Sequence, residues 1–265
     1  MRPLARLVMA TALLLLQVEP ARSQETATEI APETRPRKVP WAVGEYLEYS
    51  VKFGFLTAGS GRMQVTGIDT VRGHTVWRLH FNVSGGIPFV HVNDTYDSWM
   101  DVETLNSLRF VQDLSEAGSR HKRKYEIFPG RAMYSLNGEA EEKSVENPLD
   151  DASFFFFVRS IPLEVGETYE FHRYFNPKSN PVVIRVLRKD TVEVPAGRFP
   201  AIVIQPLIKS GGLFGEGGHA EIWLSDDNRR ILLQMKTRLS VGSLNLYLKK
   251  YNHTQEVVPP PGKTP

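Results

Sequence analysis

The chain has 265 residues, with 32 lysines and arginines against 30 aspartates and glutamates, and it contains no cysteine. The lack of cysteine excludes disulfide bonds, a cysteine nucleophile and a lipid-modified cysteine. The near balance of charge gives no overall electrostatic reason to expect nucleic-acid binding.

The first 23 residues predict a secretory signal peptide, because Arg2 and Arg6 precede an apolar stretch at 7–18 and the small residues Ala21 and Ser23 follow it. The apolar stretch is shorter than the roughly 20 residues of a membrane-spanning helix. We therefore expect cleavage after Ser23, a periplasmic or secreted location, and no transmembrane segment in the mature protein. The alternative is an uncleaved N-terminal anchor. Cleavage would leave 29 basic and 29 acidic residues.

Both ends of the mature chain have the composition of disordered segments. Residues 24–40 are rich in Thr, Glu, Ala and Pro and lack aromatic side chains, which predicts a disordered leader. Residues 257–265, with the sequence VVPPPGKTP, predict a disordered tail. A folded, β-rich body is therefore expected at 41–256.

Most of this body shows the patterns of β-strands. Apolar and polar residues alternate in several segments, others are β-branched runs, and turn pairs such as Asn137-Gly138 lie between them. The clearest of these segments are Glu45–Phe53, Val76–Val83, Val182–Ile184, Ile202–Ile204 and Leu244–Lys249. The sequence predicts an all-β fold, either an antiparallel curved sheet or an open barrel.

One short helix is predicted near residues 149–160. Pro148 and the acids Asp150 and Asp151 favour a helix N-terminus. Four phenylalanines follow at Phe154, Phe155, Phe156 and Phe157. They would point all around a helix, so little of it can face water. They form either a core plug between two sheet regions or the lining of an apolar ligand cavity.

The chain also shows an internal repeat. Gly73, Trp99 and Leu108 recur 124 positions later, and the tripeptide at 43–45 recurs at 165–167. This spacing predicts two similar meander halves, about 41–147 and 161–256, joined by the short helix. The alternative is two unrelated stretches of alternating strand.

No complete catalytic motif is present. The serine-hydrolase elbow, phosphate loop, dinucleotide fingerprint and zinc-protease helix are all missing, and no cofactor is expected. His219 and Glu221 could share a metal on one strand face, but a metal site needs three or four ligands, so surface residues are the favoured reading and no metal is expected.

An acidic cluster surrounds Tyr96 and Trp99. Its members are Asp94, Asp97, Asp101 and Glu103. Paired carboxylates beside aromatic rings are used in glycoside hydrolysis, although strand-to-turn junctions attract aspartate for structural reasons. The cluster leaves open whether the protein is an enzyme, and no catalytic residue is assigned.

Two further segments suggest contact surfaces. Alternation along 120–124 places Arg120, Lys122 and Lys124 on one strand face, with His121 and Arg123 on the other. This basic strand is either a solvated face or a contact for anionic lipid head groups or glycans. The glycine-rich loop 210–218 carries Leu213 and Phe214, which either fold over the core or dock on a partner.

Several motifs, in order, resemble a known family. They include Gly44-Glu45-x-Leu47-x-Tyr49, Asn93-Asp94-x-Tyr96, Phe155-Phe156-x-Val158-Arg159, Pro195-Ala196-Gly197-x-Phe199 and Ile222-Trp223-Leu224-Ser225. Across nearly all of 41–251 the chain resembles the family called domain of unknown function 3108. The resemblance implies an exported, β-rich bacterial protein in the periplasm, and it supplies no catalytic residues.

The leading hypothesis is a non-enzymatic envelope protein that binds or carries an apolar or lipid-like ligand. Its candidate ligand-binding residues are Phe154, Phe155, Phe156, Phe157, Leu213, Phe214, Tyr96 and Trp99. Two alternatives stay open. One is a structural or assembly partner that docks through Leu213, Phe214 and the basic strand. The other is a glycan-active enzyme that uses the region Asp94–Asp101.

Overall fold

The computed structural model describes residues 38–54, 56–87, 90–116, 119–207, 220–238 and 243–252, all within the unit Arg35–Pro265. The signal peptide 1–23, nearly all of the leader 24–40 and the tail 257–265 lie outside these ranges and stay predictions. In the described ranges, no helix has the length and apolar character needed to cross a membrane.

The described residues form one antiparallel sheet. Its fourteen strands are β1 (Tyr46–Phe53), β2 (Leu56–Val71), β3 (His74–Ile87), β4 (Val90–Asp101), β5 (Ser107–Glu116), β6 (Ser119–Phe128), β7 (Met133–Leu136), β8 (Glu142–Lys143), β9 (Thr168–Phe171), β10 (Val182–Val194), β11 (Gly197–Leu207), β12 (Ala220–Ser225), β13 (Leu232–Arg238) and β14 (Ser243–Tyr251). The helices are α1 (Asp151–Phe157) and the 3-10 turns η1 (Pro129–Arg131), η2 (Val158–Ser160) and η3 (Pro177–Ser179).

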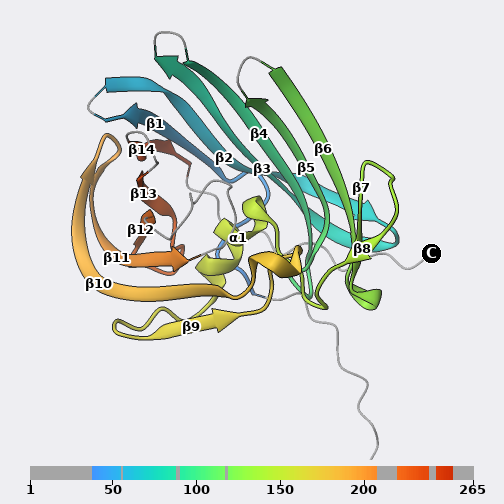
Figure 1. Cartoon of the computed structure of the whole chain (residues 1–265). Coiled ribbons are helices and arrows are strands. Elements are labelled where there is room, and N and C mark those ends of the chain that lie inside the picture. The colour runs from blue at the N-terminus through green and yellow to red at the C-terminus, as the bar shows by residue number, and fades with distance from the viewer. Residues whose placement is uncertain are drawn as a thin grey trace, which may run out of the picture. The chain divides into compact units, whose positions relative to one another are not determined.

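The strand order runs from β8 down to β1, crosses to β14, and continues down to β9. The first and last strands therefore pair, and β8 and β9 are the two edges of a sheet that is not closed. The sheet curves around α1, which lies on its concave face (Figure 1). The predicted fold class, a curved antiparallel sheet with one short helix, is confirmed.

Within the described residues, the two edges are bridged beyond their strands. Leu149, in the segment after β8, forms a parallel bridge with Tyr174, in the segment after β9. The Leu149 amide donates to the Arg173 carbonyl, and the Phe175 amide donates to the Leu149 carbonyl at 2.9 Å. We call these four residues the seam. The seam links the two edges of the sheet beside the start of α1.

Helix α1 begins where the sequence predicts, and its first turn has a capping box. The Asp150 carboxylate accepts from the Ala152 and Ser153 amides at 2.9 and 2.8 Å, and the Ser153 hydroxyl accepts from the Asp150 amide at 2.8 Å. These bonds satisfy N–H groups that a buried helix start would otherwise leave unpaired. These hydrogen bonds allow a seven-residue helix to be buried in the core.

The internal repeat is visible in the backbone. Gly44 and Gly166 have positive φ angles of 87° and 94°. The Gly44 amide donates to the Val65 carbonyl on β2, and the Gly166 amide donates to the Val186 carbonyl on β10. Directly after these two valines, β2 and β10 each carry a bulge, between Val65 and Gly67 and between Val186 and Arg188. An extra residue therefore interrupts both ladders at the same place in each half.

The repeated tryptophans also match. The Trp99 indole donates to Asp69 at 3.1 Å, and the Trp223 indole donates to Asp190 at 3.0 Å. Both β4 and β12 have a register shift at these tryptophans, and cationic side chains lie over both rings. The two similar meander halves predicted from sequence spacing share these bulges and side-chain bonds.

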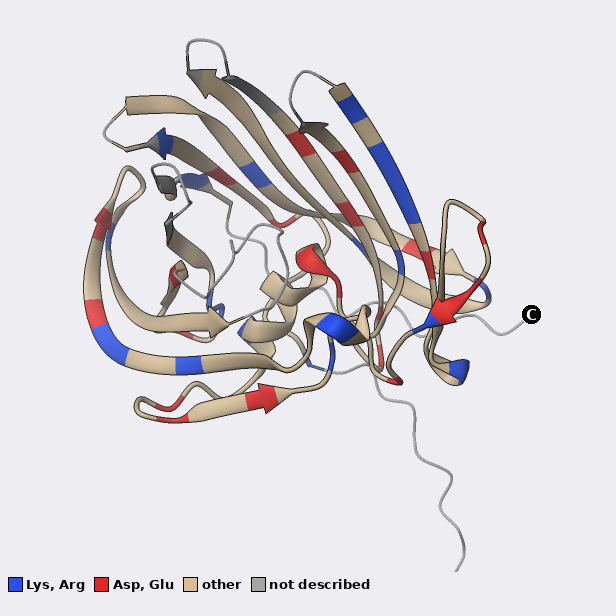
Figure 2. Ribbon diagram, in the orientation of Figure 1, with Lys and Arg blue, Asp and Glu red and all other residues tan. Residues whose placement is uncertain are grey.

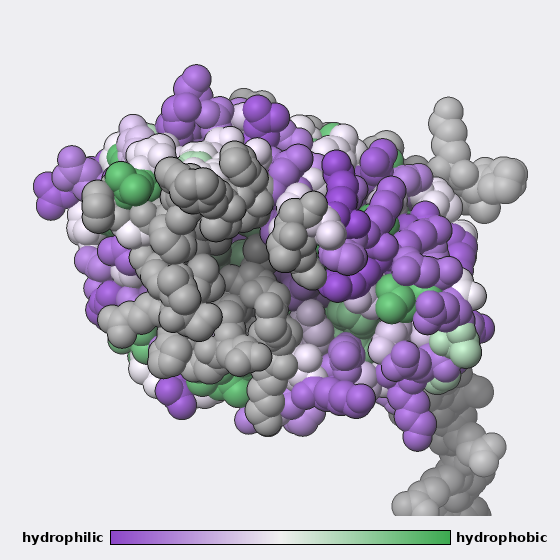
Figure 3. All heavy atoms as spheres, turned by 45° about the horizontal axis from the view of Figure 1, so that its top comes forward, coloured by the Kyte–Doolittle hydropathy of each residue, from purple (hydrophilic) through white to green (hydrophobic). Residues whose placement is uncertain are grey.

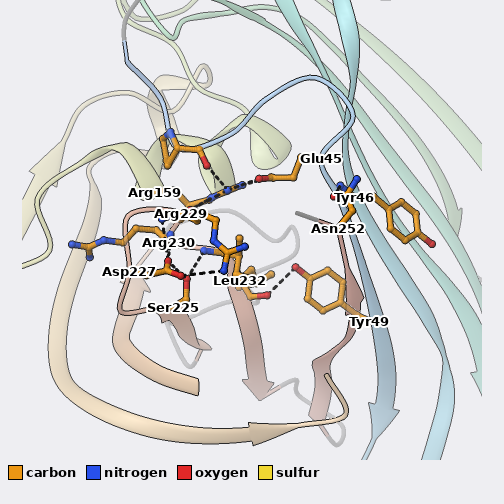
Figure 4. Close-up of polar contacts among 12 residues, drawn as sticks. Glu45, Tyr46, Tyr49, Arg159, Ser225, Asp227, Arg229, Arg230, Leu232 and Asn252 are labelled. Atoms are coloured by element: carbon orange, nitrogen blue, oxygen red, sulfur yellow. Dashed lines mark hydrogen bonds and ion pairs between the residues drawn. The ribbon is translucent and has the colours of Figure 1, made fainter. Parts of the chain in front are cut away.

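A buried ion pair ties the linker after α1 to both halves (Figure 4). The Arg159 side chain is fully buried, and it donates to both Glu45 carboxylate oxygens at 2.6 and 2.8 Å. It also donates to the Pro40 and Arg229 carbonyls and lies 5.6 Å from the Trp41 ring centre. Because Glu45 precedes β1 and Arg229 precedes β13, one guanidinium group joins three distant segments.

Candidate functional site

The four phenylalanines of α1 lie in the packed interior. Phe154, Phe155, Phe156 and Phe157 are each at most 3% exposed. Phe155 packs 5.5 Å from Phe81 on β3, and Phe157 packs 5.2 Å from Phe171 on β9. Within the described residues these four side chains contact the protein's own core, which is the position expected of a plug.

A row of five aromatic side chains crosses the concave face next to α1. It runs Phe81, Tyr96, Phe110, Tyr125 and Tyr134 over strands β3 to β7, with neighbouring ring centres 5.9–6.4 Å apart. The central rings are nearly parallel, with interplanar angles of 17° and 19°. We call this set the aromatic row. Ladder pairing of β3 to β7 positions it, because residues on one face of neighbouring strands lie side by side.

The seam covers one end of the aromatic row. The Phe175 ring lies 4.9 Å from Tyr125, 5.3 Å from Tyr134 and 6.2 Å from Phe110. The Ser144 hydroxyl donates to the Phe175 carbonyl at 2.7 Å. The segment that joins the sheet edges therefore also shields the aromatic rings from solvent.

Two buried acids at the start of α1 bind side chains of strands that carry the aromatic row. Asp150 accepts from the Ser98 hydroxyl at 2.6 Å, while Asp151 accepts from the Tyr174 hydroxyl at 2.9 Å and from the Gln112 amide at 3.1 Å. Burial raises the pKa of Asp150 despite these hydrogen bonds. Burial, opposed by the Tyr174 hydrogen bond and assisted by the Asp150 charge, raises the pKa of Asp151 to about 7.

We predict that Asp151→Asn flattens the dependence of stability on pH. The folded-state pKa of about 7 lies above the unfolded value of about 4, so the folded state binds the proton more tightly between these limits. Asp151 therefore lowers stability as the pH rises from 4 to 7, by about 1.4 kcal/mol per unit of pKa difference. Urea unfolding of both proteins at several pH values measures the effect.

The exposed acid Glu103, on the β4–β5 turn, provides the control. The Glu103→Gln variant should follow the wild-type curve between pH 4 and 8. A constant difference between Asp151→Asn and wild type across that range would contradict the assignment of the titration to Asp151.

The basic strand β6 divides its charges between two faces, as predicted. His121 and Arg123 pair across the ladder with the buried β5 residues Leu114 and Gln112, on the face that carries Tyr125. On the convex face, Arg120 binds Asp113 with two hydrogen bonds, of 2.5 and 2.9 Å. Figure 2 shows lysines and arginines in blue along β6, and Figure 3 shows hydrophilic residues gathered where β5 and β6 lie.

Two of the predicted ligand residues lie on opposite faces of β4. Tyr96 belongs to the aromatic row, whereas Trp99 is on the convex face, with Arg78 and Arg109 within 5.7 and 5.5 Å of its ring centre. The structure therefore does not bring Trp99 together with the α1 phenylalanines. Leu213 and Phe214 lie outside the described residues.

The acidic cluster around Tyr96 is divided among separate partners. Asp94 accepts from the Ser115 amide at 2.8 Å, Asp97 contacts His80 at 2.7 Å, and Asp101 contacts His74 at 3.0 Å. Asp101 also accepts from the Glu103 amide at 3.0 Å, which is a turn contact. These contacts give the carboxylates structural partners and no common target. In the described ranges no three His, Asp or Glu residues form a group that could hold a metal ion.

Sequence reasoning did not find the acid network or the aromatic row. Asp150 and Asp151 were recognised only as helix-capping residues, and their partners Gln112 and Tyr174 are far away in the chain. The alternation of residues in 107–116 and 119–128 does indicate that Phe110 and Tyr125 lie on the inward face of their strands. Strand register was needed to place these two rings opposite each other.

The chain is similar to one protein family and to two solved structures. The family Protein of unknown function (DUF3108) matches residues 48–249. The chain is similar to the crystal structure of a β-barrel-like protein of domain of unknown function DUF1849 from Brucella abortus, with a TM-score of 0.50 and 10% identity over 81% of this chain and 99% of that one. A candidate lipoprotein from Parabacteroides distasonis also aligns, with a TM-score of 0.35, 10% identity and coverage of 82% and 99%. No curated protein matches.

Proposed function

The chain belongs to the family Protein of unknown function (DUF3108), and from that premise we propose that it is an exported envelope protein that binds an apolar or lipid-like ligand without catalysing a reaction. The aromatic row carries this proposal. Five ring systems follow one another across the concave face of an open sheet, and in this structure they are covered by Phe155 and Phe175. Flat aromatic surfaces are well suited to pack against hydrocarbon once the Phe175 ring moves away.

The polar groups beside the row favour an amphiphile with an anionic head group. His121 and Arg123 lie on the same face of β6 as Tyr125, toward the end of the strand away from Tyr134. Guanidinium groups bind carboxylates and phosphates through charge-assisted hydrogen bonds. An acyl chain along the aromatic row would therefore place its head group near these cations.

We infer that the ligand reaches the aromatic row through the seam. Phe175 and Tyr174 occupy the end of the aromatic row, and the edge strands β8 and β9 are not hydrogen-bonded to each other. A ligand chain can take the place of the Phe175 ring if the Leu149 side of the short seam separates from the Arg173–Phe175 side. The proposal therefore requires local opening at the seam and leaves the fourteen-strand ladder intact.

The experiment is a calorimetric titration of the protein with oleate and with its neutral counterpart monoolein, which measures the affinity for each lipid. We predict that Arg123→Gln weakens oleate binding about tenfold, because a hydrogen bond to a charged group contributes about 1.5–3 kcal/mol. Monoolein binding should change little, since it has no anionic group for Arg123 to bind.

The matched control is Lys122→Gln, the neighbouring residue whose side chain lies on the opposite face of β6. It removes the same charge from the same strand and should leave both affinities unchanged. Equal losses in the two variants would mean that Arg123 acts only through overall charge. No binding of either lipid to the wild-type protein would refute the proposed function.

The other two functions considered from the sequence receive less support. Docking through the basic strand would rely on its three convex-face cations, and two of them already have acidic partners: Arg120 pairs with Asp113, and Lys124 lies 2.9 Å from Glu126. A glycan-active enzyme would require converging carboxylates, and those of Asp94, Asp97 and Asp101 have separate partners.

A further inference from the structure

A cleft of about 710 Å³ is lined by none of the residues of the aromatic row. Its walls come from the start of β3, the β4–β5 turn, η1 and the segment at 146–147 that leads toward α1. The volume is within the range of small-molecule sites. We call it the rim cleft.

A buried amide forms part of its wall. Asn106 is 5% exposed, and its side-chain oxygen accepts from the Arg173 guanidinium at 2.8 Å. Because Arg173 can only donate, this bond fixes which end of the amide is oxygen. The Asn106 Nδ2 group has no hydrogen-bond partner among the described residues, and it is not one of their fully buried unpaired atoms. A donor on the cleft wall is therefore left for a ligand.

The positioning of this amide is rigid. Arg173 also donates to the Leu105 carbonyl at 3.1 Å and to the Asn147 carbonyl at 2.8 Å, and its guanidinium lies 4.5 Å from the Phe157 ring centre. The group that orients Asn106 is thereby anchored to both the β4–β5 turn and α1. A preorganised donor loses little entropy when a ligand binds.

A histidine on the same cleft is also oriented by a buried acid. His74 Nδ1 lies 3.0 Å from Asp101 Oδ2, and the Asp101 side chain is 6% exposed. The other Asp101 oxygen accepts from the Thr104 amide at 2.8 Å, so the carboxylate is fixed in turn. This arrangement leaves His74 Nε2 available to a further partner, as donor or acceptor.

The remaining charges are mixed in sign. Glu146 and Arg131 both line the cleft, and Arg131 pairs with Glu141 while its guanidinium lies 4.0 Å from the Phe128 ring centre. No single sign dominates, which disfavours a strongly charged ligand. An amide donor, an imidazole and a carboxylate together suit hydroxyl groups, since each hydroxyl both donates and accepts.

We propose that the rim cleft binds a saccharide, recognised through its hydroxyl groups by Asn106, His74 and Glu146. The site is independent of the proposed lipid function, because it uses none of the aromatic row or of β6's inward cations. It is a binding site only, and no bond is broken in it.

The test is a nuclear magnetic resonance titration of the labelled full chain with maltose, cellobiose and diacetylchitobiose. At least one disaccharide should shift the Asn106 side-chain amide and the His74 imidazole signals, with a dissociation constant of about 1 mM. His74→Gln and Glu146→Gln should each weaken that binding about three- to tenfold, the effect of one lost hydrogen bond.

The control is His80→Gln, which removes the similar His80–Asp97 pair, 2.7 Å apart, outside the cleft. It should leave the dissociation constant unchanged. Three results would overturn the proposal. They are no shifts at about ten times the expected constant, an equal loss in His80→Gln, or tighter binding of butylammonium, which would show a cation site instead.

Discussion

Replacing Arg159 with methionine should lower the free energy of unfolding by about 3–5 kcal/mol. Methionine fills much of the same space, but it leaves the Glu45 carboxylate, 6% exposed, without its cation. The Pro40 and Arg229 carbonyls also lose their donor. Urea unfolding measures the loss, and a cycle with Glu45→Leu separates its causes. The double variant should be more stable than Arg159→Met alone, because it removes the unpaired charge.

The matched comparison is the exposed pair Lys249–Glu48, which has a similar distance of 2.9 Å but a lysine side chain that is 48% exposed. Lys249→Met should cost less than about 1 kcal/mol, since water screens such pairs. A loss of similar size in Lys249→Met and Arg159→Met would contradict the role of Arg159 as the buried tie between the halves.

Replacing Gly85 with alanine should destabilise the protein by about 3 kcal/mol, at the upper end of the cost of overpacking. Gly85 pairs with Gly59 across β2 and β3. A Cβ atom at Gly85 would lie 2.1 Å from the Ala58 carbonyl oxygen and 2.6 Å from the Gly59 Cα. Both are backbone atoms, so the strands themselves would have to separate. The melting temperature should fall by about 2–4 °C for each kcal/mol lost.

Gly67, on the same strand as Gly59, is the control. A Cβ atom added there meets nothing within 4 Å. Gly67→Ala should be neutral or slightly stabilising, because alanine reduces the entropy of the unfolded chain. A Gly85→Ala variant as stable as Gly67→Ala would show that β2 and β3 are not so close at this point.

The fold followed from local patterns to a large extent. Alternation in Glu45–Phe53 predicted β1, and Asp150 before four phenylalanines predicted the start of α1. The spacing of Trp99 and Trp223 predicted two similar halves, whose equivalent bulges the structure then located. These features depend on residues close in sequence or on a repeated spacing, both of which a single chain reveals.

The site was less accessible from the sequence because its contacts join distant segments. Arg159 and Glu45 are 114 positions apart, and Gln112 and Asp151 are 39 apart. Nothing local marks them as partners. The grouping of Tyr96 with Trp99 is a different case, since alternation places residues three apart on opposite strand faces. Tyr96 and Trp99 are close in sequence, but the strand places them on opposite faces of the sheet.

Native mass spectrometry of protein purified from its own host tests the central claim most directly. If the aromatic row holds a lipid-like ligand, the spectrum should contain a species heavier than the polypeptide by the mass of a lipid, and solvent extraction should recover that lipid. A spectrum of bare polypeptide alone, with no lipid in the extract, would contradict the claim.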